Sequence, residues 1–111
     1  MLLQQLIKEF LLACVAERKA DTTIQAYRYH LACFRKFTGN IYVEDITPKK
    51  VRAFITHEMT REGPQGPLSS ASVHKAFSVI RTFLKWAHQE GILNDDPMVH
   101  VKAPKLEYRL P

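Results

Sequence analysis

A run of polar residues between His74 and Lys85 is spaced so that a single helix would present them together. At about 100° per residue, one narrow sector would hold His74, Ser78, Arg81 and Lys85, flanked by Lys75 and Thr82. We call these six residues the basic wedge. No Asp or Glu occurs between Gly63 and Gln89, whereas a solvated helix face usually mixes both signs. A surface of one sign favours binding of a polyanion such as a phosphate backbone, and the alternative is a plain solvated face.

A second group of polar residues lies near residue 22, where the apolar periodicity indicates the start of another helix. Backbone amides and the helix dipole favour phosphate at such an end, and three side chains are placed there: Thr22, Gln25 and Arg28. Further basic residues surround the segment, opposed by Asp21 alone: Arg18, Lys19, Arg35 and Lys36. Thr22 and Gln25 also fit a capping box, in which side chains satisfy amide donors at the helix start. Capping alone therefore also explains these two residues.

Residues that could perform catalysis or hold a metal ion are present, but their spacing suits neither task. His74 and His88 belong to one expected helix yet lie 14 residues apart, which is too far to share an ion. Asp95 and Asp96 stand directly before Pro97, which favours a helix cap over paired catalytic carboxylates. Phosphate-loop and nucleophile-elbow motifs are also absent. We therefore expect no catalytic residue, no cofactor and no metal site in this chain.

The composition suits one soluble domain. The chain has 111 residues, of which 46% are hydrophobic, and 16 Lys+Arg against 11 Asp+Glu give a net charge of +5. Cys14 and Cys33 form no CxxC motif, and the apolar pattern around each indicates a small buried thiol in a reducing compartment. No run approaches the ~18 apolar residues of a membrane span. We expect a cytoplasmic protein that contacts no membrane and is monomeric as isolated.

Four segments show apolar residues at three- and four-residue steps, which is the pattern of amphipathic helices. We expect helices over residues 2–18, 23–38, 48–62 and 70–90, followed by a short fifth helix over 97–101. Thr47 and Pro48 suit the cap and first position of the third helix, and Ser69 or Ser70 suits the cap of the fourth. Residues 41–43 are too short a run to count as a strand. The expected fold class is all-α, a compact bundle of four main helices plus a short fifth.

The order and spacing of these residues resemble the core-binding, SAM-like domain of tyrosine recombinases and phage integrases, most closely the Xer type. The first half of the resemblance rests on Thr22-Thr23-Ile24-Gln25-Ala26-Tyr27, then Phe34, then Val43-Glu44-Asp45-Ile46-Thr47. The second half rests on Ser72-Val73, Phe77-Ser78-Val79-Ile80-Arg81, Phe83, Trp86, Gly91-Ile92-Leu93 and Asp95-Asp96-Pro97. The tail from Pro104 to Pro111 resembles the linker before the family's catalytic domain. No single motif is decisive, but the resemblance spans nearly the whole chain.

The resemblance implies a DNA-binding module that clamps duplex DNA at a recombination site, while a separate carboxy-terminal domain performs strand exchange. In the family, the second and fourth helices face the major groove. Carried over residue by residue, this places near DNA Thr22, Gln25 and Arg28 on the second helix, and Ser72, His74, Lys75, Ser78, Arg81 and Lys85 on the fourth. Ala26 departs from the pattern, because some relatives have a polar contact there. Residues 1–102 would form the domain and residues 103–111 the linker.

The implied partners are double-stranded DNA, the protein's own catalytic domain and neighbouring protomers on DNA, in a bacterial or phage-encoded protein. Relatives use their first and last helices to contact protomers, so Leu2, Leu3 and Leu11 are either partly exposed for that purpose or packed in the core. No tyrosine is assigned as a nucleophile, because Tyr27 fits the core and no basic cluster surrounds the other three: Tyr29, Tyr42 and Tyr108. The alternative function is a helical module that docks protein partners, with the basic wedge incidental.

Overall fold

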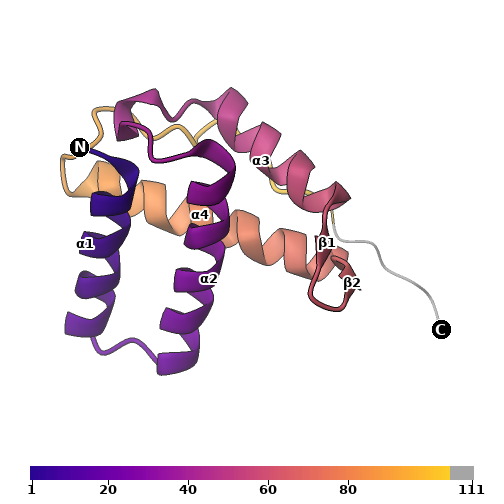
Figure 1. The fold of residues 1–111 in the computed structure, drawn as a ribbon. Helices are drawn as coiled ribbons and strands as arrows, with labels where there is room; N and C mark the ends of the chain where they lie inside the picture. Colours follow the sequence, from indigo (N-terminus) through magenta and orange to yellow (C-terminus); the bar gives the residue numbers. More distant parts are fainter. Residues whose placement is uncertain (106–111) are drawn as a thin grey trace.

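The computed structural model describes residues 1–105, and it confirms the all-α class. Its helices are α1 (Leu3–Ala16), α2 (Asp21–Thr38), α3 (Pro48–Thr60) and α4 (Ser70–Gln89), with a 3-10 turn, η1, at Val43–Asp45 (Figure 1). A small hairpin of β1 (Glu62–Gly63) and β2 (Gly66–Pro67) joins α3 to α4. Most of the expected linker, including Tyr108, lies outside the described residues. None of the helices described is long and apolar enough to cross a membrane.

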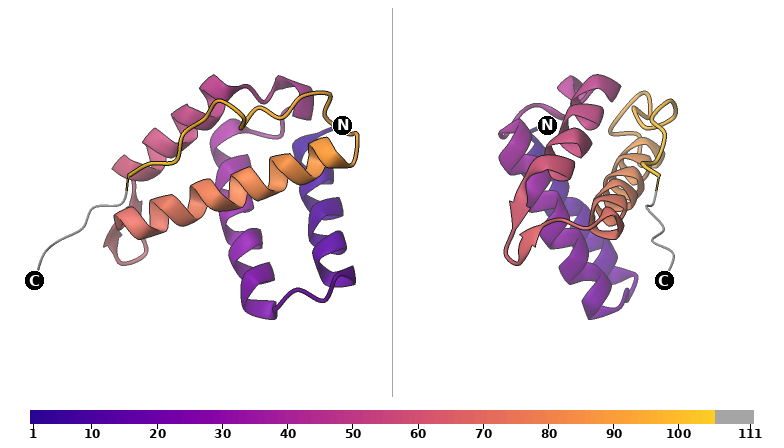
Figure 2. Two further views of the ribbon diagram at one scale, coloured as in Figure 1. Left: turned by 180° about the vertical axis from the view of Figure 1, so that it is seen from behind. Right: turned by 90° about the vertical axis from the view of Figure 1, so that its right-hand side faces the viewer.

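Helix α4 lies at the centre of the packing, as its broad apolar surface predicts. α1 and α2 lie side by side across one face of α4. α3 and the segment after α4, residues 94–105, cover another face (Figures 1 and 2). Phe10 of α1 joins three helices through ring contacts, with centroids 5.4 Å from Tyr27, 5.4 Å from Phe83 and 5.3 Å from Trp86. This arrangement buries one side of α4 completely and leaves the opposite side free for solvent.

Two helix starts are capped as the sequence predicts. The Lys50 amide donates to Thr47 Oγ1 at 3.2 Å, with Pro48 at the first position of α3. The Ser72 amide donates to Ser69 Oγ at 3.1 Å, so Ser69 is the cap of α4. Each cap satisfies an amide that the helix itself leaves without a partner.

The prediction of a capping box at Thr22 is wrong. α2 begins at Asp21, its cap is Ala20, and no side chain caps it. The Ile24 amide already donates to the Ala20 carbonyl at 3.0 Å, so the helix starts two residues earlier than expected. The carboxylate of Asp21 stands in the first turn, where the helix dipole favours a negative charge. Thr22 and Gln25 are therefore ordinary exposed residues of α2.

The short fifth helix over 97–101 is also not formed. The Met98 amide donates to Asp96 Oδ1 at 2.9 Å, so Asp96 does cap this segment, but only two isolated turns follow. The Val99 amide reaches the Asp96 carbonyl and the Val101 amide reaches the Met98 carbonyl, both three residues back. The segment is held instead by tertiary contacts, because Met98 is buried in the core and Arg52 Nη2 donates to the His100 carbonyl at 3.2 Å.

Two extended pairings escape the local sequence pattern. The Leu3 amide donates to the Ile41 carbonyl at 2.8 Å and the Val43 amide donates to the Met1 carbonyl at 2.9 Å, which ties the amino terminus to residues 41–43. α3 ends at Thr60 rather than at residue 62, and the turn-rich loop after it pairs as the β1–β2 hairpin. Gly66 makes this turn possible with φ of 101°, a value that side chains disfavour.

Candidate nucleic-acid interface

The structure brings the six residues of the basic wedge onto the solvent side of α4. Lys75, Arg81, Thr82 and Lys85 are exposed, whereas His74 and Ser78 are half-buried. Phe83, which points to α1, is fully buried on the other side. The wedge predicted from spacing is therefore a continuous strip of surface.

The cations of the wedge make no ion pair within residues 1–105. The ion pairs within residues 1–105 join other residues: Met1 with Glu44, Lys19 with Glu17, and Arg61 with Glu58. The Arg81 guanidinium carbon lies 5.6 Å from the centroid of the Phe77 ring, a cation–π contact that steadies this side chain against α4. The Thr82 hydroxyl donates to the Ser78 carbonyl at 3.0 Å. The strip thus combines unpaired positive charge with short polar side chains.

Ser72 does not belong to the wedge, although the family resemblance grouped it there. It stands two residues before His74, which on a helix places it about 160° away. Its hydroxyl accepts from Ser69 Oγ at 3.2 Å, and it lines a separate hollow beside Tyr29 and His30. The predicted residues of α4 thus fall on two different surfaces.

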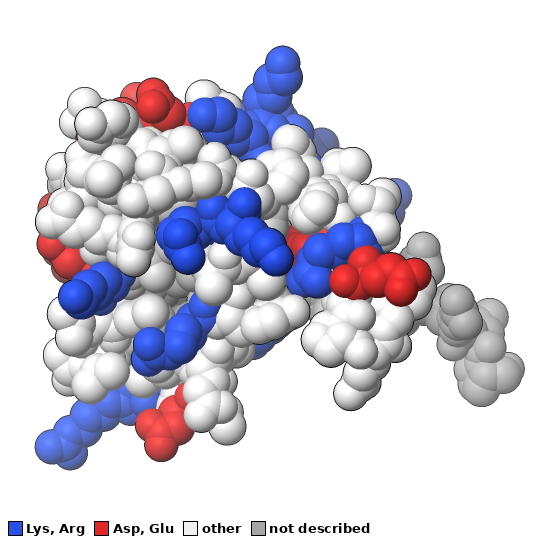
Figure 3. All heavy atoms as spheres, viewed as in Figure 1, with Lys and Arg blue, Asp and Glu red and all other residues white. Residues whose placement is uncertain are grey.

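The predicted residues of α2 are exposed but less concentrated. Thr22, Gln25 and Arg28 all reach solvent, yet Arg28 lies about 120° around the helix from Thr22. Figure 3 shows Lys and Arg side chains spread over the face formed by α1 and α2, with Asp and Glu gathered toward its edges. This face is basic, but it presents no sector as narrow as the wedge.

His30 of α2 lies near the Lys75 edge of the wedge, and it was not among the predicted site residues. Its side chain is half-buried, and burial lowers its pKa below the ordinary value of 6.5, while the nearby charges of Lys75 and Arg61 lower it further against the opposite effect of Glu58. The charge of Lys75 acts on His30, so this edge of the wedge lies near α2. A lone histidine between apolar positions gives no sequence signal for this.

A buried ion pair between Glu58 and Arg61 was also missed. Glu58 is 1% exposed, and both of its oxygens accept from the Arg61 guanidinium. Arg61 Nη2 also donates to Tyr29 Oη at 3.3 Å, and these bonds raise the pKa of Arg61. The network ties the end of α3 to α2, next to the hairpin. The one sequence signal for this ion pair is an acid and a base at i, i+3, and that spacing is common on solvated helices.

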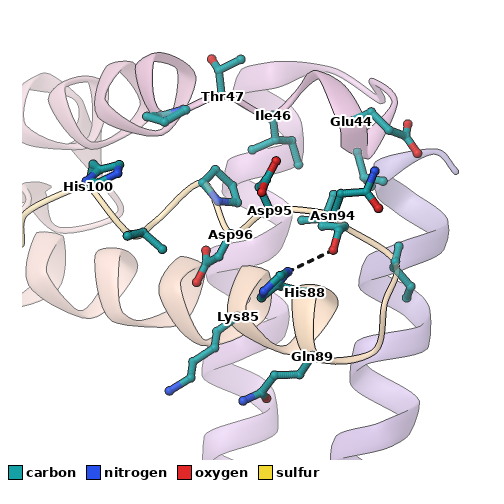
Figure 4. A pocket seen from close by; sticks show the side chains of 16 residues that line it. Glu44, Ile46, Thr47, Lys85, His88, Gln89, Asn94, Asp95, Asp96 and His100 are labelled. Carbon is teal, nitrogen blue, oxygen red and sulfur yellow. Dashed lines mark hydrogen bonds between the residues drawn. The ribbon is translucent and has the colours of Figure 1, made fainter.

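A wide hollow lies at the other end of α4, between η1, the start of α3 and residues 92–100 (Figure 4). His88 Nδ1 lies 3.1 Å from the Leu93 carbonyl there. Lys85 of the wedge lines it together with three acidic residues, which make it less suited to a polyanion than the rest of the wedge: Glu44, Asp95 and Asp96. Within residues 1–105, no three His, Cys, Asp or Glu residues lie close enough together to hold a metal ion.

The exposure expected at the amino terminus is only partly present. Leu2 is 38% exposed and Leu11 is half-buried, but Leu3 is fully buried in the core. Of the two alternatives left open for Leu3, the structure shows core packing, because Leu3 shares the apolar stripe of α1 with Leu6 and Phe10. Two other apolar side chains of α1 are more exposed than Leu2: Leu12 at 62% and Val15 at 57%.

Comparison with known proteins gives a consistent result. The sequence fits the model of the phage integrase SAM-like domain over residues 3–103. It is 27% identical over 108 residues to tyrosine recombinase XerC of Alcanivorax borkumensis, covering 96% of this chain and 34% of the relative. It is 30% identical over 111 residues to XerC of Listeria innocua, covering 96% and 35%, and 30% identical over 109 residues to XerD of Agrobacterium fabrum, covering 95% and 31%. The chain thus spans about a third of the length of these relatives. No solved structure matches it significantly.

Proposed function

The chain belongs to the family of phage integrase SAM-like domains, and from this premise we propose that it is the DNA-binding module of a site-specific tyrosine recombinase. The basic wedge of α4 would press against the phosphates of duplex DNA, and Thr22, Gln25 and Arg28 of α2 would add contacts. Strand exchange would be performed by a catalytic domain outside this chain, and neighbouring protomers would assemble on the same DNA. As part of a bacterial or phage-encoded recombinase, the module would act in the cytoplasm, on nucleoid DNA.

The observation that carries this proposal is the exposed strip of unpaired cations on α4. From Lys75 to Lys85 the helix rises about 15 Å, slightly more than the ~12 Å width of the major groove. The two ends of the wedge therefore have the reach to contact phosphates on both walls of the groove. Ser78, between those ends, would then face the base edges.

The proposal is tested by reversing two charges of the wedge. We expect the double variant Lys75→Glu, Arg81→Glu to lose at least about a hundredfold in affinity for a duplex oligonucleotide, because attraction to phosphate becomes repulsion. Lys49→Glu, Lys50→Glu is the matched control, since both lysines are exposed in the first turn of α3 and the net charge changes equally. Fluorescence anisotropy measures the affinity and circular dichroism checks the fold.

Equal losses in both double variants would show that total charge, and not the wedge, drives binding. If the unmodified chain shows no shift of amide resonances with a duplex at low salt, the DNA-binding function is wrong. The helical module that docks protein partners is the alternative, and the exposed Leu12 and Val15 are the observation that favours it.

A further inference from the structure

A second hollow lies between α2, the β1–β2 hairpin and the first turn of α4. In Figures 1 and 2 the hairpin projects from the bundle at the amino-terminal end of α4, to the same side of α4 as the first half of α2. The space between them is about 430 Å³, within the range of ligand-binding pockets. Its polar lining comes from four parts of the chain: Tyr29 and His30 of α2, Arg61 after α3, Gln65 of the hairpin, and Ser69 and Ser72 at the start of α4.

The chemistry of this lining suits an anion. The described residues that line the hollow include no Asp or Glu. Glu58 is buried and does not line the hollow, but it is bound to the Arg61 guanidinium and pairs with its charge. Lys75 follows Ser72 by one helical turn, is exposed and makes no ion pair within residues 1–105, so it adds positive charge to the paired charge of Arg61.

Two hydroxyl groups in the hollow are held ready to donate. Tyr29 Oη accepts from Arg61 Nη2 at 3.3 Å, and Ser72 Oγ accepts from Ser69 Oγ at 3.2 Å. Neither hydroxyl proton has an acceptor within residues 1–105. The same lining includes His30, whose buried Nδ1 has no hydrogen-bond partner among the described residues. Polar groups that are oriented but unsatisfied are what a bound ligand requires.

We propose that this hollow receives one phosphodiester group of the DNA backbone. The Tyr29 and Ser72 hydroxyls would donate to its non-bridging oxygens, and Arg61 and Lys75 would supply positive charge. The inference rests on the proposed function and extends it, because it assigns a backbone contact to the hairpin side of the molecule. It also explains how Ser72 can contact DNA although it stands apart from the wedge.

The experiment compares Ser72→Asp with Ser70→Asp. Both positions lie in the first turn of α4, where a carboxylate favours the helix, so both variants are expected to fold. Ser70 lines a different hollow, beside Met59 and Pro104. A carboxylate at residue 72 would face the phosphate directly, so we expect at least about a tenfold loss of duplex affinity. The salt dependence of log K should also become shallower by about 0.9, the share of one phosphate contact. Ser70→Asp should lose less than about threefold, because salt screens the longer distance.

The outcomes separate this inference from the proposed function. If the unmodified chain binds DNA and the two variants lose equally, or neither loses, the phosphate site is wrong while DNA binding stands. If the unmodified chain does not bind DNA, both proposals fail. Should Ser72→Asp unfold, amide shifts in the unmodified chain give the answer. Titration with a duplex should shift the amide resonances of residues 61–72. If these resonances do not shift, the proposed phosphate site is wrong.

Discussion

The Glu58–Arg61 pair allows a sharp prediction about stability. Glu58 is 1% exposed and Arg61 is 21% exposed, so the carboxylate is removed from water and depends on Arg61 for compensation. Arg61 Nη2 also reaches Tyr29 Oη at 3.3 Å and Cys33 Sγ at 3.7 Å. Replacing Arg61 therefore strands a buried negative charge and removes the bonds between the end of α3 and α2.

We expect Arg61→Leu to lower the free energy of unfolding by about 3–5 kcal/mol, the cost of leaving one member of a buried ion pair alone. That loss is a large part of the ~5–15 kcal/mol that holds a domain folded. The double variant Glu58→Leu, Arg61→Leu should recover most of it, because two apolar side chains need no compensation. Tyr29→Phe removes one hydrogen bond and should cost only about 1 kcal/mol.

Urea unfolding followed by far-ultraviolet circular dichroism measures these differences. The order expected is Arg61→Leu least stable, with the double variant clearly above it. A single variant that loses less than about 1 kcal/mol, or a double variant no more stable than the single one, would refute the argument from buried charge.

Three further predictions concern the fold. Thr47→Ala removes the cap that accepts from the Lys50 amide and should lower the free energy of unfolding by about 1 kcal/mol in urea titrations, and no loss would mean that the cap is replaced by water. Phe83→Ala removes one buried ring from the aromatic cluster around Phe10 and should cost about 3–5 kcal/mol, or prevent folding; a cost near zero would contradict the packing. Burial lowers the pKa of folded His30, so the unfolded chain binds more protons and stability falls as the pH drops through about 6.5. His30→Gln should remove that part of the pH dependence, and an unchanged profile would exclude His30 as its source.

The parts of the fold that depend on neighbouring residues could be predicted from the sequence. The periodicity of apolar residues gives four helices, and Thr47 and Ser69 give the starts of two of them, because caps act within one turn. The wedge was predictable for the same reason, since its residues share one helix.

The parts that escaped prediction depend on residues distant in the chain. The residues near Leu3 do not indicate that its amide pairs with the Ile41 carbonyl. The residues near Glu58 do not indicate that its side chain is buried. The hairpin changes the surroundings of Ser72 from open solvent to a lined hollow. Helical spacing alone would have separated Ser72 from His74, and only the family resemblance placed them together.

The salt dependence of duplex binding tests the account most directly. Anisotropy titrations of the unmodified chain over a range of NaCl concentrations give the slope of log K against log [NaCl]. Because three exposed cations of the wedge, Lys75, Arg81 and Lys85, would each release a counterion, we predict a slope of about −2.7 or steeper. A flat slope, or no binding at the lowest salt, would contradict the account.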